Sequence, residues 1–136
     1  MARLFDSSAL VEQMLNHERS TSFYRSSAIL DLTVYEAANA FWKLWRVRKH
    51  ITFEDASEHL ENLGRLRGVL NIFSVASLDL SAVHRLAKAT GLTFYDSSVL
   101  AVAEQNRLEL VTADANLRRA ASGRTRVIAP QDLDDS

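Results

Sequence analysis

The chain has 136 residues, of which 47% are hydrophobic and 24% charged, with a formal net charge of −1. This size and balance predict one folded domain over residues 1–136, with a substantial core and a frayed polar tail at 131–136. The absence of cysteine excludes disulfides, thiolate zinc sites and cysteine nucleophiles, and the near-neutral charge argues against a protein held on nucleic acid mainly by nonspecific phosphate contacts.

Short apolar segments typical of strands alternate along the chain with longer segments whose apolar residues recur at helical spacing. In chain order we expect a strand at 2–5, a helix at 7–16, a strand at 29–32, helices at 34–49 and 53–66, a strand at 70–75, helices at 79–90 and 96–106, a strand at 109–112, a helix at 115–121 and a strand at 126–128. Strands separated by helices favour a parallel sheet covered on both faces.

No segment of the sequence has the character of a membrane anchor or a secretion signal. Uninterrupted apolar runs stay below the roughly 18 residues that a membrane span needs. The acidic Asp6 follows the first residue too soon for the apolar region of a signal peptide. A cytoplasmic protein is therefore expected.

Four acidic residues stand where an apolar stretch gives way to a helix: Asp6, Glu36, Asp96 and Asp114. Ligands of parallel sheets bind beyond the carboxyl ends of the strands, and Asp6 and Asp114 directly follow apolar strands. Carboxylates gathered in one pocket repel one another and acquire raised pKa values unless a cation compensates them. An oxygen-preferring cation, Mg²⁺ or Mn²⁺, suits such a pocket and indicates metal-dependent phosphodiester chemistry.

Helix capping is the alternative explanation for the same acids. Asp6, Asp96 and Asp114 are each plausible N-caps, and Thr33 with Glu36 matches the capping-box pattern. Serine, threonine or asparagine would cap equally well, so acids at all four positions favour a collective role. The pattern by itself leaves both explanations open.

Four segments together resemble the acidic motifs of the PIN-domain nucleases, and specifically the VapC-type toxins of prokaryotic toxin–antitoxin pairs. They are residues 4–10, 33–40, 95–103 and 110–117, and the resemblance covers essentially the whole chain. The sequence departs from the family pattern at two places. Ser97 replaces the alanine of many members, and some members carry a further acid where Asn116 and Leu117 stand. The second departure leaves open whether a second metal ion is bound.

The resemblance implies a three-layer α/β/α sandwich around a parallel sheet and Mg²⁺- or Mn²⁺-dependent endoribonuclease activity. It also implies a toxin with a VapB-like antitoxin partner and a homodimer. It places all four acids in the pocket, with Ser7 and Thr112 as supporting polar groups. Among the four, we assign Asp6 and Asp96 as metal ligands, because Mg²⁺ usually takes one or two carboxylates directly. Glu36 then completes the site or accepts a proton, and Asp114 holds a second metal or its waters.

The second long helix carries a polar stripe on one side. Glu36, Asn39, Lys43, Arg46 and His50 follow at helical spacing. Asn39 is a candidate to order Glu36, and Lys43 and Arg46 are candidate RNA contacts; a solvated face explains the same pattern. The apolar side of the next helix, 53–66, is a candidate partner-binding groove.

Two other functions compete with the nuclease. One is a phosphoacceptor signalling domain, against which the two serines after Asp6 count, because such domains carry adjacent acids there. The other is a noncatalytic RNA- or protein-binding module, against which four intact acids count.

Overall fold

The computed structural model describes residues 2–134. Its elements in chain order are β1 (Arg3–Phe5), α1 (Ser7–Asn16), α2 (Thr21–Tyr24), β2 (Ser27–Leu30), α3 (Asp31–Arg46), α4 (Phe53–Leu66), β3 (Asn71–Phe73), η1 (Val75–Ser77), α5 (Leu80–Thr90), α6 (Phe94–Asn106), β4 (Glu109–Val111), α7 (Ala115–Ala121), β5 (Val127–Ile128) and η2 (Pro130–Asp132). The helices α1, α4 and α7 have the predicted bounds.

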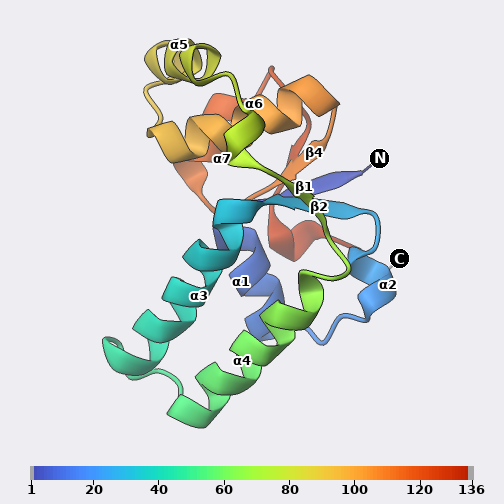
Figure 1. The fold of residues 1–136 in the computed structure, drawn as a ribbon, viewed down its shortest axis with the longest axis vertical. Helices are drawn as coiled ribbons and strands as arrows, with labels where there is room; N and C mark the ends of the chain where they lie inside the picture. Colours follow the sequence, from blue (N-terminus) through green and yellow to red (C-terminus); the bar gives the residue numbers. More distant parts are fainter. Residues whose placement is uncertain (1, 135–136) are drawn as a thin grey trace.

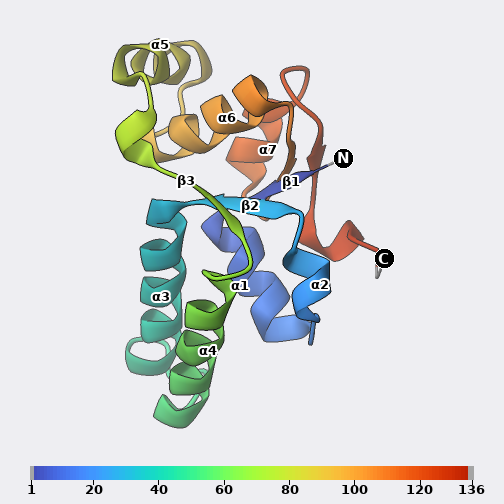
Figure 2. The same cartoon turned by 45° about the vertical axis from the view of Figure 1, so that its right-hand side comes forward.

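The five strands form one parallel sheet in the order β3-β2-β1-β4-β5. Helices α1, α3 and α4 lie on one side of this sheet and α5, α6 and α7 on the other (Figures 1 and 2). The predicted α/β/α sandwich is therefore confirmed. The order differs from the 2-1-3-4-5 of flavodoxin-like signalling domains. This difference counts against the phosphoacceptor alternative.

Alternation along the strands divides the core into two layers. Leu4 and Leu110 belong to the cluster under α6 and α7, whereas Phe5 and Val111 belong to the cluster under α1 and α3. Successive side chains of a strand point to opposite faces, so a sheet covered on both sides needs apolar residues at consecutive positions. The short, uninterrupted apolar strands of this sequence satisfy that requirement.

The sequence prediction misses helix α2 altogether and misplaces the boundary near residue 31. The second strand was placed at 29–32, but it ends at Leu30 and α3 begins at Asp31. No side chain caps this helix start, which removes the usual sequence signal. Instead, the Asp31 carboxylate accepts hydrogen bonds from the backbone N–H groups of Leu32 and Val75, at 2.9 and 3.2 Å.

The α3–α4 pair forms a hairpin that extends away from the sheet (Figure 1). The ring of Phe41 stacks on His59 with centroids 4.7 Å apart, and Trp45 meets Phe53 edge to face at 5.1 Å. Helix α3 ends at Arg46, three residues before the predicted end, so the expected continuation of its polar stripe to His50 is wrong. The chain turns at Lys49, whose φ of 55° is left-handed.

The C-terminal segment packs further than expected. Residues 131–136 were predicted to fray, but η2 covers Pro130–Asp132 and Leu133 is buried in the core layer of α1. The last two positions lie outside the described residues. Within residues 2–134, no helix combines the length and apolarity needed to cross a bilayer.

Candidate functional site

The sheet has one point where its strand order reverses, between β1 and β4. The chain proceeds from β1 to β2 on one side, while β4 pairs with β1 on the other. Open parallel sheets bind ligands at such a switch point, outside the carboxyl ends of the strands. Asp6 directly follows β1, and Thr112 and Asp114 follow β4. Two of the four predicted acids therefore lie at the expected crevice.

Asp6 is held in place by several hydrogen bonds. Its Oδ1 accepts from the Ser8 hydroxyl at 2.7 Å and from the backbone N–H of Ala9 at 2.9 Å, and its Oδ2 accepts from the Thr112 hydroxyl. The residue is only 6% exposed. A carboxylate has about four acceptor positions, so one on Oδ2 is left for a ligand.

The other aspartates occupy two helix starts. Asp114 is the N-cap of α7, where its Oδ1 accepts from the backbone N–H groups of Asn116 and Leu117. Asp96 is not a cap: Thr93 caps α6 and accepts from the Asp96 N–H at 3.2 Å. The capping explanation thus holds for Asp6 and Asp114 and is wrong for Asp96.

Glu36 projects from the second turn of α3. Because α3 begins at Asp31, Thr33 lies inside the helix, fully buried, and does not cap it. The capping-box explanation of Glu36 is therefore wrong. Glu36 is exposed, and no hydrogen bond within residues 2–134 holds its carboxylate.

The four acids influence one another electrostatically. Burial raises the pKa of Asp6, and the charge of Asp114 adds to this. Burial, then the charges of Asp114 and Asp6, raise the pKa of Asp96. Burial, then the charges of Asp96 and Asp6, raise the pKa of Glu36. The charges of Asp6 and Asp96 thus couple to those of all the other acids, whereas no coupling is resolved between Glu36 and Asp114.

This arrangement fits a hard divalent cation bound by few protein ligands. Within residues 2–134, no group of three acidic or histidine side chains is close enough to form a complete metal cage. Mg²⁺ commonly keeps several waters and takes only one or two carboxylates. The donors here are all carboxylate oxygens, and a cation would relieve the charge that raises their pKa values.

The sequence matches the model of the family described as "PIN domain" over residues 3–123. The chain belongs to the PIN domain family. Exonuclease VapC9 of Pyrobaculum aerophilum is 39% identical over 121 residues, covering 88% of this chain and 86% of that protein. Ribonuclease VapC3 of the same organism is 34% identical over 124 residues, covering 86% and 92%.

Solved structures share the fold of this PIN domain. The crystal structure of PAE2754 from Pyrobaculum aerophilum superposes with a TM-score of 0.78 at 33% identity, covering 96% of this chain and 85% of that one. A toxin–antitoxin complex from Klebsiella pneumoniae gives a TM-score of 0.65 at 20% identity, covering 96% and 99%. These likenesses agree with the resemblance seen in the sequence motifs.

The polar groups around Asp6 differ in part from those predicted. Thr112 behaves as expected: its hydroxyl donates to Asp6 and accepts from the backbone N–H of Asp114 at 3.0 Å. Ser7 makes no such bond within the described residues, and the sequence analysis missed Ser8, whose hydroxyl also accepts from the Ala113 N–H at 3.0 Å. Both serines follow the acid, so spacing alone gave no means of choosing between them.

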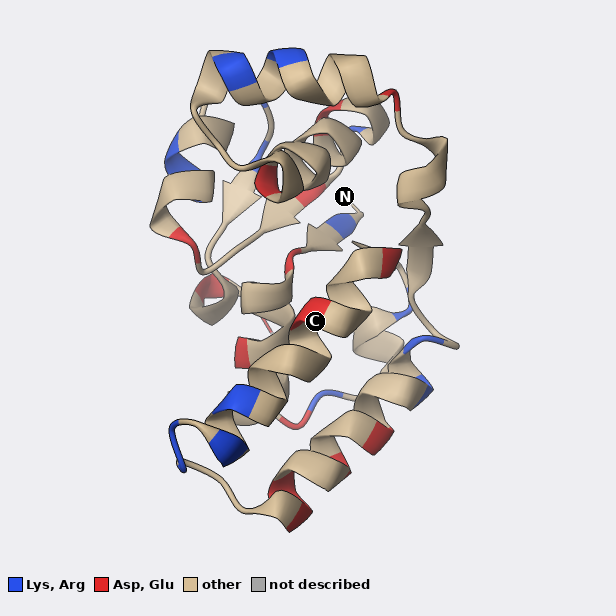
Figure 3. Ribbon diagram, turned by 60° about the vertical axis from the view of Figure 1, so that its left-hand side comes forward, with Lys and Arg blue, Asp and Glu red and all other residues tan. Residues whose placement is uncertain are grey.

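The basic residues of the PIN domain's longest helix lie away from the acids. Figure 3 shows Lys and Arg gathered at the far end of α3 and in the following loop. Lys43 and Arg46 are exposed in the last turn of α3, about 10 and 15 Å along the helix from Glu36 at 1.5 Å per residue. Asn39 is exposed and bonds no described residue, which favours a solvated position over a role in ordering Glu36.

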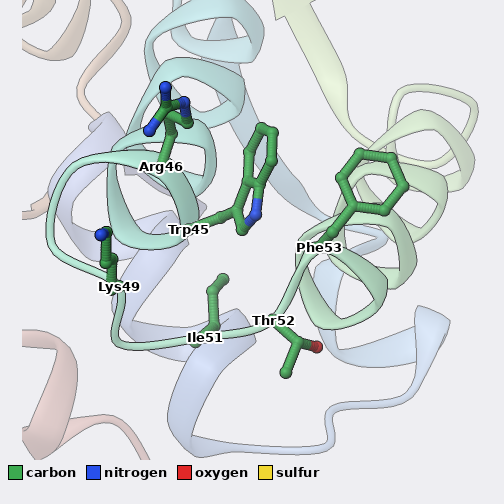
Figure 4. Close-up of a pocket in the computed structure, with 6 residues that line it drawn as sticks. All are labelled: Trp45, Arg46, Lys49, Ile51, Thr52 and Phe53. Carbon is green, nitrogen blue, oxygen red and sulfur yellow. The ribbon is translucent and has the colours of Figure 1, made fainter.

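A hollow of about 420 Å³ lies at the end of the hairpin, where Arg46 and Lys49 lie on one side of Trp45, and Phe53 on the other (Figure 4). The predicted groove on the apolar side of α4 is a separate feature. It has a volume of about 330 Å³ and lies between α3 and α4, where Leu60 and Leu63 face Val34 and Tyr35. Tyr35 is 80% exposed, which is unusual for so large an aromatic side chain beside an apolar groove.

Proposed function

We propose that this PIN domain is a Mg²⁺- or Mn²⁺-dependent endoribonuclease that hydrolyses RNA phosphodiester bonds. One observation carries the proposal: Asp6 and Asp96 each interact with all the other acids at the switch point of the sheet. Capping accounts for neither the position of Asp96 nor the exposure of Glu36. The names of the curated relatives, an exonuclease and a ribonuclease, agree with a nuclease.

In this mechanism the protein supplies orientation and proton transfer. Asp6 and Asp96 would hold the metal ion, which when bound lowers the pKa of an attacking water and offsets negative charge on the phosphoryl oxygens. The hydrogen bonds from Ser8, Ala9 and Thr112 fix the Asp6 carboxylate and leave one acceptor position on Oδ2 unused. Orientation of this kind costs nothing during the reaction because the bonds already exist in the free protein.

Glu36 and Asp114 have different parts in the same mechanism. Glu36 has a raised pKa and a carboxylate free of hydrogen bonds to described residues, so it suits proton acceptance from the attacking water. Asp114 uses Oδ1 to cap α7 and retains Oδ2, which suits it to hold metal-bound waters or a second ion.

A circular RNA tests the activity and its type together. Purified, partner-free protein should linearise the circle with Mg²⁺ or Mn²⁺ and leave it intact with EDTA. Because a circle has no ends, an exonuclease would spare it and degrade only a linear RNA of the same sequence. Degradation of the linear form alone would replace the endonuclease assignment with exonuclease activity. Cleavage in EDTA would remove the metal from the mechanism.

The same chain is proposed as the toxin of a type II toxin–antitoxin pair, acting in the cytoplasm. The α3–α4 groove suits an amphipathic segment of a VapB-like antitoxin, because Tyr35, Leu60 and Ile72 leave apolar surface exposed there. Expression of the chain alone should slow growth, and Asp6→Asn should relieve the effect. Co-expression of the protein encoded by the neighbouring gene should restore growth, and Leu60→Asp should abolish that rescue without reducing RNA cleavage.

A homodimer is also proposed. Exposed Leu80, Phe94 and Tyr95 on α5 and α6 provide apolar surface for self-association. Light scattering coupled to gel filtration would measure the mass in solution, and a mass near 15.3 kDa would contradict the dimer.

A further inference from the structure

A second hollow adjoins the acidic site on the side of α7. It has a volume of about 400 Å³ and lies between the turn 90–93 and the outer face of α7. Asp96 lines it together with Asn116 and Arg119. A side chain that we assign to metal binding therefore forms one wall of this pocket.

The wall of the pocket on α7 has the charge opposite to that of Asp96. Arg119 is the one cationic side chain among the residues that line it. Its guanidinium donates to Asn116 Oδ1 at 3.3 Å and forms no ion pair within residues 2–134. Asn116 is neutral and its amide NH₂ has no partner among described groups, so this wall presents hydrogen-bond donors and positive charge.

Neighbouring arginines lack these properties. Arg118 is adjacent in sequence but does not line the pocket. Arg124 forms an ion pair with Glu104 at 3.5 Å. Arg119 therefore differs from the neighbouring arginines in lining the pocket without an ion-pair partner among the described residues.

A nuclease with clustered carboxylates must attract an anionic substrate to a negative surface. Arginine binds phosphate with two parallel hydrogen bonds, and such charge-assisted bonds are roughly twice as strong as neutral ones. A pocket of this volume is within the range of small-ligand sites. A nucleotide lying in it would adjoin any phosphate bound at Asp96.

We propose that this pocket is a subsite for the RNA nucleotide next to the scissile phosphate, with Arg119 binding that nucleotide's own phosphate. The assignment rests on the proposed nuclease function and deepens it. It makes Arg119 a residue for substrate binding, separate from the acids that carry the chemistry.

Equilibrium binding of a short fluorescent RNA measures this role without relying on cleavage. Glu36→Gln is a suitable background, because Glu36 is assigned to proton acceptance and does not line the pocket. In Mg²⁺, adding Arg119→Ala should weaken RNA binding about tenfold and reduce the slope of log K against log salt by about 0.7, the value for one phosphate contact on a single strand. Adding Arg118→Ala, the matched control, should change both quantities much less.

Replacing single phosphates by neutral methylphosphonates identifies the contact. The methylphosphonate beside the scissile position should weaken RNA binding to the Glu36→Gln protein. It should not weaken binding further when Arg119→Ala is also present. Arg119→Lys should retain most of the salt dependence and lose part of the affinity, because lysine keeps the charge but lacks the planar guanidinium that forms two parallel hydrogen bonds. Thermal unfolding of each variant checks that the exposed substitution leaves the fold intact.

The outcomes separate the two proposals. Cleavage of RNA by the wild-type protein together with equal losses from Arg118→Ala and Arg119→Ala would overturn the subsite and leave the nuclease intact. The subsite is also wrong if every methylphosphonate acts equally on both proteins. Failure of the wild-type protein to bind or cleave RNA would overturn the proposed function, and the subsite with it.

Discussion

The acidic edge of the sheet and the basic end of the α3–α4 hairpin are built in opposite ways. Asp6 is buried and receives three hydrogen bonds, one of them from a residue 106 positions away. Lys43 and Arg46 are exposed and form no ion pair with the described residues. Asp6 and Asp114 are positioned by core strands, whereas the cations extend into solvent from a helix end.

This difference separates two tasks. Fixed carboxylates suit a metal ion, since ligand positions must hold within a fraction of an ångström. Mobile cations suit the capture of a flexible polyanion, since long-range attraction needs no fixed geometry. Substitutions at the acidic edge should therefore change the reaction rate, and substitutions at the hairpin end should change affinity.

The largest effect is expected from Asp96→Asn. Loss of one of the two central carboxylates should reduce Mg²⁺-dependent RNA cleavage by roughly 10³-fold, because metal binding and water activation both depend on it. The matched control is Asp79→Asn, which changes the N-cap of α5, a position where asparagine caps equally well. Equal activity of the two variants in a fluorescent cleavage assay would contradict the assignment of Asp96.

A double charge reversal at the hairpin end should act on affinity. We expect Lys43→Glu with Arg46→Glu to weaken RNA binding about tenfold at low salt and to leave Mg²⁺ affinity nearly unchanged. Arg85→Glu with Lys88→Glu on α5 changes the net charge equally in the other helical layer and serves as the control. The same loss from both pairs would show that net charge alone is responsible.

The raised pKa values give the metal-free protein a pH dependence of defined sign. In the folded protein the pKa values of Asp6, Glu36 and Asp96 lie above their ordinary values of 3.8, 4.5 and 3.8, so these groups bind protons more tightly than in the unfolded chain. Their contribution to stability is therefore most favourable below those values and declines as pH rises through the raised folded values. In EDTA at pH 7, Asp96→Asn should melt about 2–5 °C above the wild type, and the difference should shrink towards pH 4.

Mg²⁺ should reverse this ranking at pH 7. A bound ion stabilises the wild type in proportion to its affinity, whereas Asp96→Asn loses that gain. Calorimetric melting of the wild type and of Asp96→Asn, with and without Mg²⁺, measures how much the ion stabilises each protein. A wild type that melts identically in EDTA and in millimolar Mg²⁺ or Mn²⁺, with and without RNA, would contradict the metal site.

The smallest expected effect concerns two neighbouring serines beside Asp96. The Ser97 hydroxyl is fully buried without a partner within residues 2–134, whereas the Ser98 hydroxyl donates to the Phe94 carbonyl at 2.9 Å. Ser97→Ala should raise the free energy of unfolding by about 1 kcal/mol, because an unpaired buried hydroxyl is removed. Ser98→Ala should be neutral or destabilising. Urea unfolding of both variants measures the difference, and a loss of stability in Ser97→Ala would reveal an unseen partner for its hydroxyl.

The sequence by itself determined the layered fold and the residues that carry acid groups. Apolar strands alternating with amphipathic helices specify a covered parallel sheet, and helices α1 and α4 were predicted with their bounds because caps and periodicity agree there. These are local signals, written within a few residues of each element. The same applies to Asp6 and Asp114, which stand within three residues of the ends of their strands.

Only the tertiary structure decided how the acids relate to one another. Their placement depends on the pairing of β1 with β4, on Thr93 rather than Asp96 capping α6, and on the start of α3 at Asp31, which is fixed by a bond to Val75. The choice of Ser8 over Ser7 and the pocket beside Arg119 have the same origin. The Thr93 cap is a local bond between two candidate caps that the sequence did not distinguish. The other features depend on contacts between residues distant in the chain, such as that of Ser8 with Ala113, and a single sequence records local preferences but not which distant segments meet.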